Sequence, residues 1–308
     1  MEEQVKLQIV DKLKFVRGLI DSRAFDAVRG FLSTEIGKII CDNASIQLCI
    51  RENYINVYYK GCSVLKYSPL ETTNRYLIHD KYLDGGDRDT YVSLDLAGNN
   101  DSKKMLLLLS SLDKSLNKYI VGEKKHLASY ISSAGQKPFL LDLEVAFIRK
   151  RDQEEKAKSA GNRDYIADRI DMACIARIDN KATLQLVEVK IDTDSRLRSS
   201  IQGGQEVLIQ MKHYRSFIKD QEQNIQESYR MIADNYLKLN LLSKFPNASE
   251  ALDMLQEFRV SGRVDLEPYL LIIRTKENMK GKYGDHAQLL TDELIKNGYK
   301  PPLLWDAV

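Results

Sequence analysis

Two short segments carry acids and a lysine whose types and spacing could support chemistry. They read Ile170-Asp171-Met172-Ala173-Cys174-Ile175 and Leu186-Val187-Glu188-Val189-Lys190-Ile191. Both are predicted strands, and strand side chains alternate between faces, so Glu188 and Lys190 point the same way. A buried strand carries two charges on one face only for a reason, because an uncompensated buried charge is costly. The pattern indicates either a structural ion pair or an active site.

The elements that would position these residues follow an α/β pattern. Apolar spacing predicts, in chain order, a helix over 102–132, three strands over 139–149, 168–178 and 183–191, a helix over 199–219 and a short buried strand over 269–273. Asp179-Asn180-Lys181 predicts a hairpin turn between the second and third strands. Further helices are predicted over 221–243 and 286–297.

The first part of the chain has a different pattern. Helical spacing over residues 5–39 gives way to alternation over 46–50, 55–59 and 64–67, which predicts helices followed by an antiparallel β-meander, with a further strand near 74–79. The polar, glycine-rich stretch 84–101 predicts a boundary. We therefore expect an accessory region over residues 1–100, contacting a partner or DNA, and a larger domain over residues 101–308.

Composition excludes several classes of protein. The 308 residues have a net charge of only +2, so any nucleic-acid contact must come from a local basic patch. Four cysteines (Cys41, Cys49, Cys62 and Cys174) form no CxxC pair, which argues against structural zinc and favours reduced thiols. The N-terminus lacks a signal-peptide pattern, and the longest apolar run, Met105 to Leu109, is too short to cross a membrane. A cytoplasmic protein without a membrane partner is expected.

The order of elements across residues 102–274, together with Ile170-Asp171, sixteen intervening residues and Glu188-Val189-Lys190, resembles the PD-(D/E)XK nuclease superfamily. The resemblance implies a restriction-endonuclease-like core with a mixed central sheet flanked by helices. It also implies a metal-dependent phosphodiesterase in which Asp171 and Glu188 bind Mg²⁺, with Mn²⁺ as a substitute, and Lys190 helps to position or activate the attacking water. Ile170 stands where the motif name has proline.

The chemistry of these side chains agrees with that resemblance. Mg²⁺ is bound through a few carboxylates while it keeps waters and phosphate oxygens. It lowers the pKa of a bound water and neutralises charge growing on a phosphate. Carboxylates held close together repel and tend to protonate unless a cation lies between them.

Further residues match the family pattern. Many members carry an acid upstream, for which Glu144 is the candidate metal ligand and Glu123 its rival; Asp168 competes with Asp171. Gln210 on the helix after the lysine strand is a further candidate catalytic residue, and Tyr214 lies one turn later. The predicted nucleic-acid contacts are Arg196, Arg198, Lys212 and Tyr214.

Three functions remain open from the sequence. The first is a nuclease acting on nucleic acid, with a DNA endonuclease or exonuclease of restriction, defence or repair favoured and a homodimer as an option for cutting both strands. The second is a non-catalytic nucleic-acid-binding or adaptor protein on the same fold. The third is a structural hairpin whose charges only pair with one another.

Overall fold

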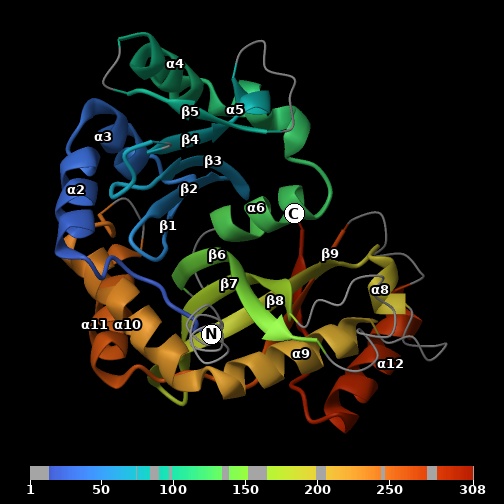
Figure 1. Cartoon of the computed structure of the whole chain (residues 1–308). Helices are drawn as coiled ribbons and strands as arrows, with labels where there is room; N and C mark the ends of the chain where they lie inside the picture. Colours follow the sequence, from blue (N-terminus) through green and yellow to red (C-terminus); the bar gives the residue numbers. More distant parts are fainter. Residues whose placement is uncertain are drawn as a thin grey trace, which may run out of the picture.

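The computed structural model describes residues 14–73, 75–83, 90–96, 99–133, 139–151, 165–198, 206–243, 247–275 and 283–307. Within these ranges the chain is a mixed α/β protein with two five-stranded sheets (Figure 1). This confirms the α/β class that the sequence predicts.

The first sheet is the antiparallel meander that the alternating apolar residues predict. Its strands lie side by side in chain order and are β1 (Ile46–Ile50), β2 (Ile55–Tyr59), β3 (Cys62–Tyr67), β4 (Tyr76–His79) and β5 (Tyr91–Leu94). The last of these falls inside the 84–101 stretch whose composition predicts a boundary. A short 3-10 helix, Asp80–Tyr82, follows β4.

Helices flank this sheet. The first two are α2 (Ser22–Leu32) and α3 (Glu35–Asp42), which lie along one side of the meander in Figure 1. Each begins at a side-chain cap: Asp21 accepts from the backbone N–H of Arg23, and the Thr34 hydroxyl accepts from that of Gly37.

The region predicted as one helix over 102–132 is divided. It forms α4 (Asn99–Ser110), α5 (Leu112–Leu116), a 3-10 turn at Asn117–Tyr119 and α6 (Glu123–Ser132). Gly122, with a φ of +56°, separates α6 from the preceding turn because this conformation suits glycine and cannot continue a helix. In Figure 1, α4 and α5 lie beside β5, whereas α6 lies between the meander and the second sheet. The division at residue 100 therefore stays a prediction.

The second sheet has the order β10-β9-β8-β7-β6. The strands are β6 (Phe139–Lys150), β7 (Tyr165–Ile178), β8 (Lys181–Ile191), β9 (Tyr269–Arg274) and β10 (Leu303–Asp306). The first three are antiparallel, β9 is parallel to β8, and β10 is parallel to β9. Asp179 and Asn180 have φ of 50° and 61°, so the predicted hairpin closes with the left-handed pair that a tight two-residue turn requires.

Helices cover both faces of the second sheet. On one face, Leu127 of α6 packs with Val187 and Val189. On the other face lie α9 (Glu206–Asp220), α10 (Glu222–Lys238) and α11 (Ala248–Ser261), the last of which the sequence pattern did not predict. Two more helices, α8 (Ser195–Arg198) and α12 (Tyr283–Lys296), complete the described part. None of the helices in these ranges has the length and hydropathy needed to cross a bilayer.

Candidate active site

The acids of interest lie where β7 and β8 separate. Their antiparallel pairing ends at Met172 and Val187, and Asp171 and Glu188 occupy the next opposite positions. Beyond that point the backbone of β8 bonds to the Asp171 side chain instead of to the β7 backbone. The Val189 N–H donates to Asp171 Oδ2 at 2.7 Å. The parted strand ends therefore bring the two acids together without breaking the sheet.

Glu188 and Lys190 share one face of β8, as the period of two predicts. Both side chains are 2% exposed, and the Lys190 ammonium donates to Glu188 Oε1 and, at 3.0 Å, to the Val189 carbonyl. The other carboxylate oxygen, Glu188 Oε2, is buried and has no hydrogen-bond partner. We call Asp171, Glu188 and Lys190 the acid cluster.

With both of its acids ionised, the acid cluster would carry more negative than positive charge. Burial, together with the charge of Asp171, raises the pKa of Glu188 to about 8. Burial also raises the pKa of Asp171, although the Lys190 charge and the Val189 N–H act in the opposite direction. The pair consequently retains a proton at neutral pH unless a cation compensates the second carboxylate.

Glu144 stands beside this cluster on β6. The pairs Leu143–Met172 and Val145–Ile170 place it opposite Asp171, and its negative charge contributes to the raised pKa of Asp171. The Tyr58 hydroxyl donates to its Oε2 and the Arg169 guanidinium to its Oε1, each at 3.0 Å. Its φ of +51° is rare for a residue other than glycine and is a kind of strain often found at functional sites.

The structure separates one of the two pairs of rival acids. Asp168 forms an ion pair with Arg149, which leaves Asp171 as the acid of β7 in the cluster. Glu123, the first residue of α6, also faces the cluster: burial and then the charge of Asp171 raise its pKa, while Lys190 lowers it. Glu144 and Glu123 therefore both remain candidates for a third acid.

Two side chains of α9 approach the cluster from the face of the second sheet that α9 covers. The Tyr214 hydroxyl donates to the Arg169 carbonyl at 2.7 Å, and Gln210 Nε2 donates to that hydroxyl at 2.6 Å. Burial and the Glu188 charge raise the pKa of Tyr214, so the phenol stays protonated. Tyr214 is 1% exposed, which differs from the nucleic-acid contact that the sequence predicts for it. Gln210 reaches the acids through Tyr214.

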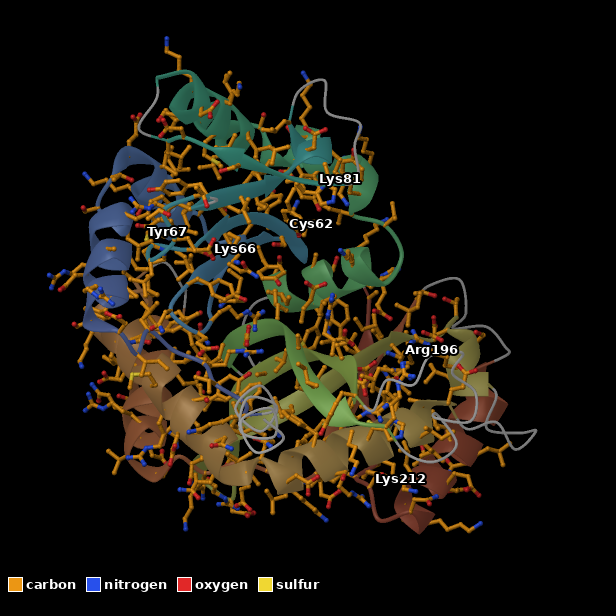
Figure 2. All side chains as sticks on the ribbon, viewed as in Figure 1. Cys62, Lys66, Tyr67, Lys81, Arg196 and Lys212 are labelled. Carbon is orange, nitrogen blue, oxygen red and sulfur yellow. The ribbon has the colours of Figure 1, made fainter. Side chains whose placement is uncertain are left out.

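The predicted basic contacts come from separate helices, as Figure 2 shows for Arg196 on α8 and Lys212 on α9. Arg196 is held by Asp194, whose carboxylate accepts from both its Nε and its Nη2. Its charge also lowers the pKa of Glu123, so it lies near the acids. Lys212 is exposed, and the side chain of Arg198 lies outside the described residues.

Sequence reasoning missed two residues of the site. Tyr58 belongs to a tyrosine-rich meander whose pattern indicates only a core, and its contact with Glu144 depends on how the two sheets pack. Arg169 could have been suspected because it lies two residues before Asp171, within reach of a neighbouring strand. Neither position carries a motif that marks it.

The donor set fits a hard divalent cation. Glu188 Oε2 offers a buried carboxylate oxygen without a partner, and Asp171 supplies a second carboxylate opposite it. Within the described ranges, however, no three acidic, histidine or cysteine side chains are close enough to form a complete metal site. A cation bound by these two acids would keep several of its ligands for water and phosphate oxygens, as Mg²⁺ does.

Comparison with known proteins gives no match: none of the family models, curated proteins or solved structures compared is significantly similar to this chain.

Proposed function

We propose that this protein is a Mg²⁺-dependent nuclease with a restriction-endonuclease-like core and that its substrate is DNA. The observation that carries the proposal is the acid cluster, in which two opposed carboxylates and a lysine are buried at the point where two strands part. One carboxylate oxygen there is buried and unsatisfied. Buried polar atoms without partners are rare, and each needs an explanation. A divalent cation held between Glu188 and Asp171 would satisfy this oxygen.

The order of elements around the cluster supports the same proposal. The helix α6 is followed by the antiparallel β6, β7 and β8, then by α8, α9, α10 and α11, and then by β9, which is parallel to β8. With α6 and α9 as the core helices and α8, α10 and α11 as additions, this order contains the αβββαβ series expected of a restriction-endonuclease-like core. The added strand β10 extends the sheet at its edge without altering this order.

The residues have separable roles in such a reaction. Asp171 and Glu188 would hold Mg²⁺, which when bound would polarise the scissile phosphate and ease deprotonation of water. Lys190 places a positive charge next to Glu188, suited to orienting the attacking water and opposing charge that grows on the phosphate. Tyr58 and Arg169 hold Glu144 beside Asp171, and Tyr214 closes the inner side of the cluster.

The test is a cleavage panel of plasmid, linear duplex, single-stranded DNA and RNA with Mg²⁺, Mn²⁺ or EDTA. We expect wild type to cleave only with metal, and Lys190→Ala to cleave at least about a thousandfold more slowly, roughly 4 kcal/mol of barrier. Lys190→Met, which keeps most of the side-chain volume, guards against loss of the fold, and circular dichroism checks each variant. Lys181→Ala removes an exposed lysine at the start of the same strand and serves as the matched control. Equal activity of wild type and both Lys190 variants would contradict the proposal.

A second candidate is a nucleic-acid-binding or adaptor protein without catalysis. The ion pair between Lys190 and Glu188 supports it, because a lysine can compensate that carboxylate without a metal ion. In that case binding would be indifferent to EDTA and to Asp171→Asn, and no nucleic acid in the panel would be cut.

A sedimentation measurement on the same protein would show whether it acts as a monomer or a dimer.

A further inference from the structure

A basic groove lies at the end of β6, apart from the acid cluster. It has a volume of about 410 Å³ and is lined by Arg149, Lys150 and Arg151 from the end of β6 and by Lys212 from α9. Among the described residues that line it, the only acid is Asp220. Asp168, from the neighbouring strand, pairs with Arg149, so among the described lining residues the positive charge left for a ligand comes mainly from Lys150 and Lys212. Lys150 and Lys212 are both exposed to solvent.

Apolar side chains line the groove together with the basic ones. Phe217 is one of them and stacks on Phe147 at a ring-centroid distance of 3.8 Å, which fixes its position. Ile148 also lines the groove and is 42% exposed, although it is a large hydrophobic residue. A lining of basic and apolar side chains suits a chain that carries phosphates on one side and sugars or bases on the other.

The groove and the acid cluster are joined by two rigid elements. Strand β6 carries Glu144 beside the cluster and Arg149 in the groove, five residues apart and therefore about 17 Å along a strand. Helix α9 carries Tyr214 at the cluster and Phe217 in the groove, on successive positions of one helix face, and both rings contact Phe147. The groove and the cluster therefore lie on the same strand and the same helix, at a fixed separation.

We propose that the basic groove holds the backbone of the same nucleic-acid strand that is cut at the acid cluster, about five nucleotides from the scissile phosphate. The spacing follows from about 17 Å divided by about 3.4 Å per nucleotide of a single strand in B-form geometry. This inference rests on the proposed function and adds to it a sequence-independent anchor. Contacts of lysine and arginine with phosphates position a strand without reading its bases.

The test compares two double variants with the same change of charge. Lys150→Glu/Lys212→Glu reverses the exposed charges of the groove, whereas Lys103→Glu/Lys114→Glu reverses two exposed lysines on α4 and α5. Fluorescence anisotropy measures the Kd of labelled single-stranded DNA for each variant. The DNA lengths are 4, 8 and 20 nucleotides, which is about one to several times the spacing between the two sites. All variants also carry Asp171→Asn, which prevents cleavage. Circular dichroism confirms the fold of each variant.

We expect the groove variant to weaken binding of the longest DNA at least about tenfold and to lower the slope of log Kd against log salt by about 1.4, which is 0.7 for each lost phosphate contact. The shortest DNA can occupy only one of the two sites at a time, so its binding should differ less between the two double variants than that of the longest DNA. Equal Kd and salt slope for the two double variants on the longest DNA would overturn the groove proposal. So would displacement of DNA by polyglutamate at an equal concentration of charge, because the groove would then be a site for acidic peptides.

The two proposals fail in different ways. If wild type cleaves DNA with Mg²⁺ and the groove variant binds and cleaves like the control, the groove proposal fails and the nuclease stands. If wild type cleaves nothing and the groove variant alone loses DNA binding, the nuclease fails and the groove stands as a binding site.

Discussion

Two groups of buried charged side chains in the described part of the protein are satisfied to very different degrees. In the first, which we call the Asp142 cluster, the fully buried Asp142 is paired with Arg51 and lies 3.7 Å from Arg17. Its carboxylate also accepts from the Tyr229 hydroxyl and the Leu143 N–H. In the acid cluster, two carboxylates share one buried lysine, and the charge of Asp171 raises the pKa of Glu188.

The difference indicates what each group does. The Asp142 cluster joins the end of β1 to β6 and α10, so it ties the meander to the second sheet, and its acid has at least as many cations as it needs. The acid cluster has too few cations for its acids and stands where two strands part. A buried group that is left incomplete is more costly than one that is complete, so its persistence favours a ligand or a reaction.

The largest expected effect is on the Asp142 cluster. Asp142→Ala should lower the free energy of unfolding by about 3–5 kcal/mol, because it leaves Arg51 buried without its partner. Urea denaturation measures this with and without Mg²⁺, and the loss should be the same in both. Asp113→Ala is the matched control, since Asp113 pairs with Lys60 on the surface and is 69% exposed, and should cost at most about 1 kcal/mol. Similar losses of unfolding free energy for the two variants would contradict a structural role for the Asp142 cluster.

The next largest effect is the pH dependence of Mg²⁺ binding to the acid cluster. Because the pKa of Glu188 is raised to about 8, Mg²⁺ must displace a proton below that pH. The affinity for Mg²⁺ should therefore fall about tenfold per pH unit from pH 8 to pH 6, about 2.7 kcal/mol in all. Calorimetry in buffers of different ionisation enthalpy measures both the affinity and the released proton. An affinity that does not change over this range would contradict the shared-proton description.

The same titration affects stability in the opposite direction when metal is absent. The folded state keeps a proton on Glu188 that the unfolded chain releases near its ordinary pKa of 4.5, so metal-free stability should fall as pH rises from about 4.5 to about 8. Glu188→Gln should flatten that part of the profile. Thermal melts in EDTA across this range measure it, and identical profiles for the two proteins would argue against a raised pKa.

The smallest expected effect is at Tyr58. Tyr58→Phe removes the hydroxyl that donates to Glu144 and should slow metal-dependent cleavage about fivefold, equivalent to about 1 kcal/mol, the usual worth of one hydrogen bond. Tyr54→Phe, from the turn before β2, is the control and should cleave like wild type. If Tyr58→Phe also cleaves like wild type, the position of Glu144 does not matter for the reaction.

Local patterns predicted what depends on strand period and turn chemistry. The shared face of Glu188 and Lys190 follows from alternation, and the turn at Asp179 and Asn180 follows from residues that tolerate positive φ. The sequence could not tell that Asp142 and Glu144, two residues apart, have different partners. Their separation depends on a bulge near Leu140, on the unusual φ of Glu144 and on Arg51 and Tyr58 from another sheet. Such contacts are long-range and leave no local signal.

The most direct test of the difference between the two buried clusters is the binding of Mg²⁺ itself. Isothermal titration calorimetry at pH 8 should give saturable Mg²⁺ binding to wild type and to Asp113→Asn, and at least about tenfold weaker binding to Asp171→Asn. The asparagine can still accept from the Val189 N–H, so the local structure is kept while a charge is lost. Equal binding by all three proteins, or no binding by wild type, would contradict the assignment of the acid cluster as a metal site.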